Sequence, residues 1–246
     1  GQDFSYTETT QADFQSGTLT DVVATSAGDL ELKKEEIDSY TKLLLHMDGT
    51  DNGTIFTDEC GKTVTRYGAV TKTGVKKFGT ASGYFDGGES TRLEITGLEA
   101  IGTGDYTVEC WIYLTAINKY SSIFEYSNFP SLRINPNNKL TAPMAGVSVH
   151  PETLTTNTWY HVAIIRYNGY TNIYINGVGG TAIEDSRNYT ATALKIGEVW
   201  DSTNGYNFSG YIDEFRISKG IARWTSDFIP PSAPYGDYKS LALVKK

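Results

Sequence analysis

The sequence predicts an all-β domain, a sandwich or barrel of many short strands, and three observations lead to this fold class. Apolar and polar residues alternate with a period of two in several segments, the pattern of a strand with two different faces. Turn residues, above all Gly and Asn, separate these segments roughly every 8–12 residues. The composition, with 17 Tyr and 25 Gly among 246 residues, favours strands and turns over helices.

The chain is expected to have three parts. Residues 1–39 contain short strand-like runs joined by glycines and end in a charged run, so we expect an N-terminal β extension or linker. A denser strand pattern from 40 to 235 predicts the main domain. Residues 236–246 form a C-terminal tail.

The first strand of the main domain is expected at the apolar run Leu43–Met47, which ends before Asp48. Further strands are expected at short alternating or apolar runs: 64–70, 82–85, 91–95, 106–114, 122–125 and 194–197. Only 218–225 has a helical pattern, and we expect Trp224 to anchor that helix against a sheet.

The clearest hairpin joins 159–167 to 171–175. Asn168 and Gly169 lie between these runs, and both tolerate the positive φ that a tight hairpin turn requires. A second Asn-Gly pair, at 176–177, predicts the next chain reversal.

An acidic pair, Asp213 and Glu214, lies inside a strand predicted over 211–217. Strict alternation places the two carboxylates on opposite faces of that strand. A carboxylate buried in a sheet needs either backbone N–H donors or a cation. The segment is therefore a structural anchor or a metal ligand, and it does not have the form of a catalytic centre by itself.

Charge and composition exclude several classes of partner. The net charge is −8 and no block of Lys or Arg is present, so nucleic acid and anionic membranes are not expected partners. No apolar run approaches the roughly 18 residues of a membrane span. No signal peptide is present, which leaves secretion open because the start at Gly1-Gln2 is compatible with a trimmed leader. Cys60 and Cys110 are expected to be free thiols, with a bridge as the alternative.

Six motifs carry a family resemblance, and they are, in chain order, KFGTASGYFDG at 77–87, DYTVECWIY at 105–113, WYHVAIIR at 159–166, IYING at 173–177, IG at 196–197 and GYIDEFRIS at 210–218. Together they resemble the LamG-like (laminin G type) branch of the concanavalin A-like lectin/glucanase superfamily over about 40–235. The ending IARWTSDFIPP at 221–231 is similar to versions found in bacteriophage tail or virion proteins and bacterial surface proteins. The resemblance implies a jelly-roll sandwich of two antiparallel sheets.

The resemblance also implies a possible Ca²⁺, held by Asp213 with help from Asp48 at the end of the first strand. Ca²⁺ is bound by carboxylate, carbonyl and water oxygens. In the alternative without a metal, Asp213 accepts N–H groups from a neighbouring loop and Asp48 caps a turn.

Catalysis is not expected. Retaining glucanases of this fold carry an E-x-D-x-x-E or E-x-D-x-E strand that holds two carboxyl groups over one glycosidic bond. Glu94, Glu99 and Glu109 have no Asp two residues further on.

Ligand-binding residues are expected in two loops, because sugar recognition uses aromatic faces together with amide and carboxylate groups. The candidates in 199–209 and 116–130 are Trp200, Asp201, Asn204, Tyr206 and Tyr126. In the alternative, these aromatic residues cap the ends of the core. Trp111 and Trp159 are assigned structural roles, since they belong to the strand motifs.

The sequence thus favours a non-catalytic, carbohydrate-binding module of a phage virion or tail or of a secreted surface protein. Its expected partners are a glycan or host-surface ligand and other virion or surface proteins, at the virion or the cell exterior. The alternative is a structural or decoration domain that mediates protein–protein assembly without binding glycans.

Overall fold

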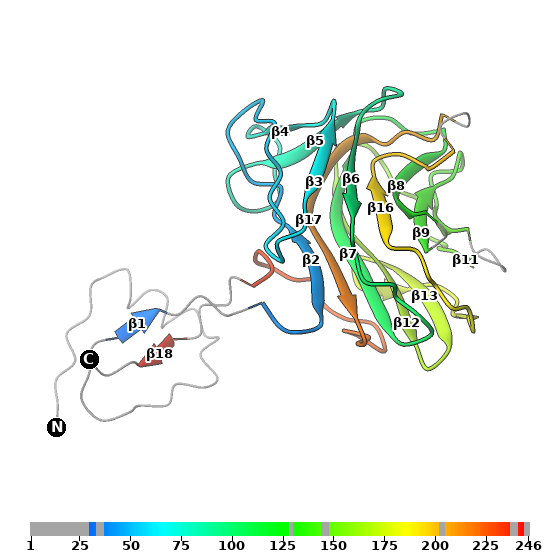
Figure 1. Ribbon diagram of the computed structural model, residues 1–246. Helices are drawn as coiled ribbons and strands as arrows, with labels where there is room; N and C mark the ends of the chain where they lie inside the picture. The colour runs from blue at the N-terminus through cyan, green and yellow to red at the C-terminus, as the bar shows by residue number, and fades with distance from the viewer. Residues whose placement is uncertain are drawn as a thin grey trace. The chain divides into compact units, whose positions relative to one another are not determined.

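The computed structural model describes residues 37–127, 130–143, 148–201 and 205–236, together with the backbone of 30–32 and 241–243. The chain forms two units, Ile37–Tyr235 and the combination of Gly1–Glu36 with Gly236–Lys246. In the latter, strand β1 (Leu30–Leu32) pairs antiparallel with β18 (Leu241–Leu243), as Figure 1 shows. The strands expected before residue 30 lie outside the described residues.

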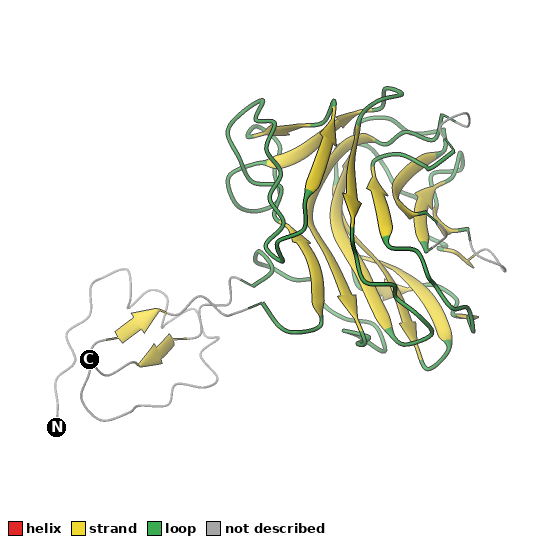
Figure 2. Cartoon of the chain, viewed as in Figure 1, coloured by secondary structure: helices red, strands yellow, loops and turns green. Residues whose placement is uncertain are grey.

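The unit Ile37–Tyr235 is a sandwich of two antiparallel sheets (Figures 1 and 2). The larger one, the β7 sheet, has the order β14-β13-β12-β7-β17-β5-β4, with β15 paired to β13 and β2 paired to β17. Its strands are β14 (Val178–Gly179), β13 (Tyr170–Ile175), β12 (Trp159–Tyr167), β7 (Tyr106–Leu114), β17 (Ser209–Lys219), β5 (Ser82–Asp86), β4 (Val70–Lys72), β15 (Ile183–Glu184) and β2 (Thr41–Leu45).

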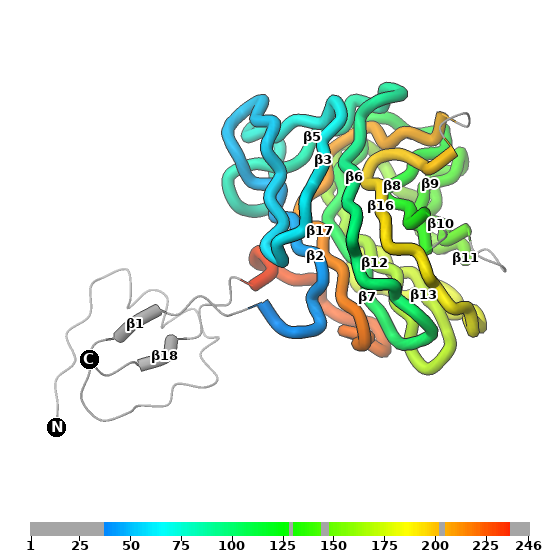
Figure 3. The backbone as a smooth tube through the Cα atoms, viewed as in Figure 1, coloured from blue at the N-terminus to red at the C-terminus, as the bar shows by residue number. Residues whose placement is uncertain are grey.

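The second sheet, the β8 sheet, has the order β11-β10-β9-β8-β16-β6-β3. Its strands are β11 (Ser148–Val149), β10 (Leu140–Ala142), β9 (Ser131–Ile134), β8 (Ser121–Tyr126), β16 (Ala193–Ile196), β6 (Arg92–Thr96) and β3 (Val64–Tyr67). Figure 3 traces how segments distant in sequence, such as β6 and β16, become neighbours in this sheet. The predicted all-β jelly-roll class is confirmed, and the described residues contain no helix, hence none long and apolar enough to cross a membrane.

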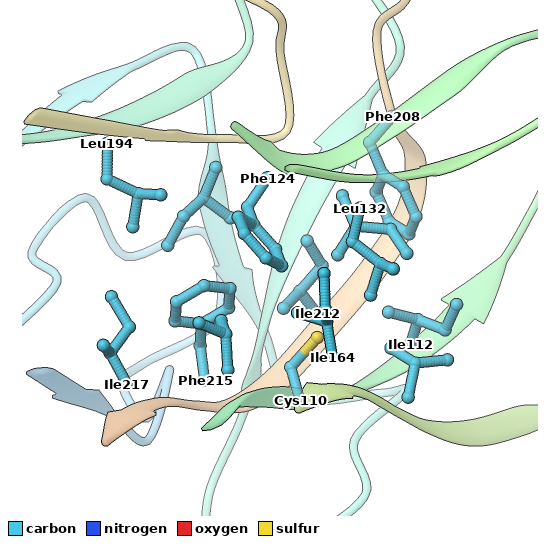
Figure 4. Packing of buried hydrophobic residues seen from close by; sticks show 14 of the residues in the cluster. Cys110, Ile112, Phe124, Leu132, Ile164, Leu194, Phe208, Ile212, Phe215 and Ile217 are labelled. Atoms are coloured by element: carbon cyan, nitrogen blue, oxygen red, sulfur yellow. The ribbon is translucent and has the colours of Figure 1, made fainter. Parts of the chain in front are cut away.

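The hydrophobic core fills the space between the two sheets (Figure 4). Cys110 and Ile212 point into it from the β7 sheet, and Leu132 and Phe124 point into it from the β8 sheet. Phe124 meets Phe215 edge-on, with ring centroids 5.6 Å apart and an interplanar angle of 81°. Burial of one such side chain stabilises the fold by about 1.5–3 kcal/mol.

Both Asn-Gly pairs form the hairpin turns that the sequence predicts. Asn168 and Gly169 have φ of 49° and 78°, and Asn176 and Gly177 have φ of 48° and 78°. Positive φ at both central residues defines a type I′ turn, whose twist matches that of the flanking strands. The first turn fixes the β12–β13 register, in which Tyr167 lies opposite Tyr170.

A β-bulge in β17 overturns the prediction that Asp213 and Glu214 point to opposite faces. Asp213 pairs with Trp111 and Arg216 pairs with Glu109, so one extra residue of β17 lies between these pairs. Glu214 has a φ of 50° at this point. The core-facing set therefore changes from Ile212 before the bulge to Phe215 and Ile217 after it, and strict period-two counting fails here.

Both carboxylates consequently lie away from the core and have local partners. Glu214 Oε1 lies 2.8 Å from His46 Nδ1, and Glu214 Oε2 accepts a hydrogen bond from the backbone N–H of Tyr235 at 2.8 Å. Asp213 accepts backbone N–H groups of the segment that precedes β5. The acidic pair thus anchors two separate loops to one strand.

The predicted helix at 218–225 is not formed. Strand β17 continues to Lys219, and Gly220 then turns the chain with a φ of 83°. The following segment lies on the outer face of the β7 sheet. There Trp224 stacks on Phe228, with ring centroids 3.9 Å apart and an interplanar angle of 6°. These rings pack against Ala163, Ile165 and Tyr174, so contact with the sheet outweighs the local helical pattern.

A buried ion cluster holds the same segment in place. Glu109 Oε1 accepts hydrogen bonds from Arg216 Nε at 2.9 Å and from Arg216 Nη2 at 2.6 Å. Glu109 Oε2 lies 3.1 Å from both His161 Nε2 and Tyr235 Oη. Burial alone would raise the pKa of Glu109, but Arg216 and His161 lower it to about 2.

Candidate functional site

Four aromatic side chains lie in a row across the outer face of the β7 sheet, the face turned away from the core. Trp159 of β12 pairs with Tyr113 of β7, Tyr113 pairs with Tyr211 of β17, and Tyr211 pairs with Tyr84 of β5. Their sequence neighbours, among them Ile112 on β7, point into the core. Because side chains alternate along a strand, all four rings share the outer face; we call these four residues the aromatic row.

The rings of the aromatic row contact one another in sequence. The centroid of Tyr113 lies 5.5 Å from that of Trp159 and 5.6 Å from that of Tyr211, and Tyr211 lies 4.9 Å from Tyr84. The corresponding interplanar angles are 56°, 81° and 42°. All four residues are half-buried, so each ring supports its neighbours and still presents part of its surface to solvent.

Polar side chains border the aromatic row towards one end of the strands. Ser209 and Asp86 form the next register pair on this face, beyond Tyr211 and Tyr84. Lys119 Nζ donates a hydrogen bond to Ser209 Oγ at 2.7 Å. Hydrogen bonds from the Thr91 hydroxyl and a backbone N–H lower the pKa of Asp86, which keeps this exposed residue charged at neutral pH. Asp86 and Lys119 can exchange hydrogen bonds with a ligand that lies on the rings, whereas Ser209 is buried and positions the Lys119 ammonium.

The opposite border of the aromatic row is covered by protein. Trp111 occupies the next outward position of β7, and Lys77 Nζ lies 4.0 Å from the centroid of its ring. The rings of Phe78 and His161 both meet Trp111 edge-on, with their centroids 5.9 Å and 5.3 Å from that of Trp111. The aromatic row therefore forms a strip between a covered part of the sheet and a polar border.

The loop predicted to bind a ligand lies on the β8 sheet, and Trp200 is fixed there. Its backbone N–H donates to Glu125 Oε2 at 3.0 Å, and its indole Nε1 donates to the Glu125 carbonyl oxygen at 3.0 Å. Lys195 Nζ lies 4.9 Å from the ring centroid. Trp200 is half-buried and Asp201 is exposed.

The other residues predicted to bind a ligand lie in different environments. Tyr206 packs against Tyr120, with ring centroids 4.6 Å apart and an interplanar angle of 32°. The Arg133 guanidinium lies 5.6 Å from the ring centroid of Tyr206. Tyr126 is only 2% exposed and belongs to the core, because it points inward from β8. The expectation that Tyr126 contacts a surface ligand is therefore corrected. Asn204 lies outside the described residues.

Charged side chains dominate the rest of the outer face of the β8 sheet. Arg92 Nε lies 2.7 Å from Glu94 Oε1 and 3.2 Å from Glu198 Oε2. Lys195 Nζ lies 3.2 Å from the same Glu198 oxygen. We call Arg92, Glu94, Lys195 and Glu198 the charged ladder; its members satisfy one another.

The predicted metal ligands Asp48 and Asp213 both bind the segment 77–81. Asp48 Oδ1 accepts hydrogen bonds from the backbone N–H groups of Thr80 and Ala81. Asp213 Oδ2 accepts the N–H groups of the first two residues of this segment, at 2.7 and 3.1 Å. This geometry matches the metal-free alternative, in which both carboxylates anchor a loop.

Two carboxylate oxygens accept none of these hydrogen bonds and remain for a cation, Asp48 Oδ2 and Asp213 Oδ1. Asp213 Oδ1 is buried without a hydrogen-bond partner. Burial raises the pKa of Asp213 to about 7, although the N–H groups of Lys77 and Phe78 lower it, and nearby Glu214 and Asp48 raise it further. Ca²⁺ takes about 6–8 oxygen ligands, and the described residues contain no group of three His, Cys, Asp or Glu side chains placed to share a metal ion. Backbone carbonyls and water would have to supply most ligands, and Ca²⁺ binding stays a prediction.

Sequence reasoning missed the aromatic row, although part of its signal was present. Tyr113 and Tyr211 fall at outward positions of strands that the motifs identify. Trp159 begins such a strand, a position from which the sequence predicts a structural role. The register that places these rings side by side depends on strand order, which alternation within one strand does not contain.

The two antiparallel sheets are those of a jelly-roll β-sandwich of the concanavalin A-like class. A laminin G-type family model, described as the concanavalin A-like lectin/glucanases superfamily, matches residues 86–223, and the chain belongs to this superfamily. The family resemblance carried by the six motifs is thereby confirmed. A comparison with curated proteins finds no match.

Solved structures confirm the fold. Domain 4 of AbnA, a GH43 extracellular arabinanase from Geobacillus stearothermophilus solved with arabinotriose, has a TM-score of 0.54 and 19% identity, over 74% of this chain and 93% of that one. The binding domain of Paraclostridial Mosquitocidal Protein 1 has a TM-score of 0.57 and 14% identity, over 73% of this chain and 49% of that one. Trypanosoma rangeli sialidase has a TM-score of 0.52 and 11% identity, over 74% of this chain and 31% of that one. The match thus spans less than half of the last two proteins, and at these identities the similarity is one of fold.

Proposed function

We propose that the domain Ile37–Tyr235 is a non-catalytic carbohydrate-binding module whose ligand lies on the aromatic row. The observation that carries this proposal is the row itself, four half-buried rings at matched register on four adjacent strands. The apolar C–H face of a sugar ring packs on an aromatic face, while its hydroxyls need hydrogen-bonding groups at the edge of the site. Asp86 and Lys119 lie at that edge.

Membership in a superfamily of lectins and glucanases supports binding of a carbohydrate. The arabinanase domain with the same fold was solved with an oligosaccharide, which makes a sugar ligand a reasonable choice for the first tests. The sialidase in the comparison is an enzyme, so the choice between binding and catalysis has to come from the residues of this chain.

The acidic pair of β17, Asp213 and Glu214, supports binding over hydrolysis. A retaining glycosidase needs two carboxyl groups about 5–5.5 Å apart on either side of one glycosidic bond. Asp213 and Glu214 are both buried, at 0% and 1% exposure, and both hold loops through backbone N–H groups. A carboxylate engaged in this way does not reach a sugar on the surface.

We place the domain in a virion, a phage tail or a cell-surface protein, because the 221–231 ending is similar to versions in such proteins. In this setting a glycan of the host surface is the ligand, and other virion or surface proteins are its neighbours. The alternative is a decoration domain that mediates assembly without any glycan.

A glycan array followed by calorimetry tests the proposal. Tyr211→Ala should weaken the binding of any glycan that the unaltered protein retains at least tenfold. Tyr170→Ala, which removes an exposed Tyr at a hairpin turn of the same sheet, should leave binding unchanged. Circular dichroism checks that both variants fold.

Two results would overturn the proposal. No retained glycan, together with stable oligomers in light scattering, would favour the decoration domain. Release of reducing sugar from a bound polysaccharide would establish an enzyme.

A further inference from the structure

From the geometry of the aromatic row we infer that its ligand is a single neutral polysaccharide chain, which crosses the strands and is bound along its interior. This inference rests on the proposed function and specifies its ligand. It excludes crystalline polysaccharide surfaces, isolated chain ends and anionic glycans as the main target.

The direction of the chain follows from the register. The four rings occur once per strand on β12, β7, β17 and β5, so the row runs perpendicular to the strands. Neighbouring strands lie about 4.8 Å apart, and three intervals span about 14 Å. A chain on this row covers about three sugar units, so its affinity depends on several rings at once.

The tilt of the rings excludes a flat ligand. Successive ring planes differ by 56°, 81° and 42°, angles that already include the twist between adjacent strands. A crystalline polysaccharide face presents sugar rings in one plane and would need coplanar aromatic rings. A single chain in solution can rotate from one unit to the next and follow the tilted rings.

The row also continues beyond its last ring. On the far side of Tyr84, the next strand places Val70 at the same register, and this residue is half-buried. A small aliphatic side chain at this position gives a continuing sugar chain room and an apolar contact. The site therefore suits an interior segment of a longer chain.

The charges around the row favour a neutral ligand. Asp86 is exposed and charged at the polar border, and the charge of Asp51 acts on the Tyr211 hydroxyl. These carboxylates accept hydrogen bonds from sugar hydroxyls and repel uronate or sialate groups. Lys119, the cation of the polar border, keeps its charge while it donates a hydrogen bond to the neutral Ser209 hydroxyl, so this border sets one cation beside the Asp86 carboxylate and has no excess positive charge for an anionic glycan.

The test uses soluble linear oligosaccharides from arabinan, xylan, mannan and β-glucan, each with two to six units, measured by calorimetry. For the series that binds, we expect affinity to rise at least tenfold between the dimer and the tetramer. Trp159→Ala and Tyr84→Ala, at the two ends of the row, should weaken hexamer binding at least fivefold and change dimer binding less than twofold. Tyr170→Ala serves as the matched control.

Each possible outcome decides a different point. If no carbohydrate of any class binds, the proposed function fails. If a glycan binds through Tyr211 but its affinity does not change with length, or the end variants affect the dimer equally, the interior-chain inference fails alone. Stronger retention on crystalline cellulose or chitin than on soluble chains, or binding of polyuronates only, also overturns the inference.

Discussion

The two outer faces of the sandwich are built on the same kind of sheet and carry opposite chemistry. On the β8 sheet, the charged ladder pairs Arg92 and Lys195 with Glu94 and Glu198, so each charge has its counter-charge within the face. On the β7 sheet, the aromatic row leaves parts of four rings open to solvent, next to a buried ion cluster around Glu109. A face whose groups satisfy one another has little left for a ligand, whereas partly open aromatic rings gain contacts when a ligand covers them.

The largest expected effect is on stability, because the charged groups of the β7 sheet are more deeply buried than those of the β8 sheet. Glu109→Gln on the β7 sheet removes a fully buried counter-charge from the partly buried Arg216 and should lower the free energy of unfolding by about 3–5 kcal/mol. Glu94→Gln in the charged ladder is the matched change, and we expect about 0–1 kcal/mol because this pair is more exposed. Urea unfolding followed by fluorescence measures both. Equal costs would contradict the contrast between the faces.

Low pH should reduce the stability of the protein mainly through Glu109 on the β7 sheet. The pKa of Glu109 is lowered to about 2 in the folded state, below its ordinary value of 4.5. The stability that this carboxylate contributes is therefore complete above about pH 4.5 and is lost as the pH falls towards about 2. Melting temperatures measured across this window should fall more steeply for the unaltered protein than for Glu109→Gln. Parallel curves would assign acid sensitivity to other groups.

Glycan binding should distinguish the aromatic row from the charged ladder. Tyr211→Ala should weaken binding at least tenfold, or about 1.4 kcal/mol, because Tyr211 contacts both Tyr113 and Tyr84. Tyr211→Phe retains the ring and should keep most of the affinity. Glu94→Gln should leave the affinity unchanged. Calorimetry gives all three values, and a loss of affinity in Glu94→Gln would move the site to the other face.

A bound Ca²⁺ would add stability to the β7 sheet by mass action, since it binds only the folded state. If Asp213 Oδ1 is a ligand, added Ca²⁺ should raise the melting temperature by a few degrees, chelator should lower it, and Asp213→Asn should remove the response. A Glu94→Gln control should respond like the unaltered protein. If neither Ca²⁺ nor chelator changes the melting temperature, the prediction that Asp48 and Asp213 bind Ca²⁺ is wrong.

The smallest expected effect is at Trp200. Trp200→Ala removes a ring fixed by Glu125 at the edge of the charged ladder, and we expect glycan affinity to change less than twofold. The sequence placed the ligand in this loop, so the same measurement tests that alternative. A tenfold loss would restore the loop 199–209 as the binding site.

Some parts of the structure could be predicted because their cause is local. The type I′ turns at Asn168-Gly169 and Asn176-Gly177 follow from the tolerance of these residues for positive φ. The alternation of apolar residues identified strands such as β7, β12 and β17, and the motif order identified the superfamily. Within β17, however, the bulge at Glu214 breaks the alternation. The bulge exists only in the pairing of β17 with β7, so alternation within β17 does not reveal it.

The candidate site was less predictable. Tyr126 and Trp159 are both strand aromatics, and only the assembled sheets show that Tyr126 faces the core and Trp159 the outside. The segment after Gly220 has a helical pattern, yet it forms an irregular, bent stretch on the β7 sheet because Trp224 and Phe228 gain more from packing there. These outcomes depend on what lies opposite each residue.

The sequence by itself determined the all-β class, the hairpin turns and the superfamily, since each depends on residues close together in the chain or on the order of short motifs. The tertiary structure alone decided which aromatic rings stand side by side and which carboxylates anchor loops. The physical reason is that alternation assigns a side chain to a face of its own strand, whereas a binding surface is made by neighbours across several strands. Strand order and register, set by packing of the whole core, bring Trp159, Tyr113, Tyr211 and Tyr84 into one row.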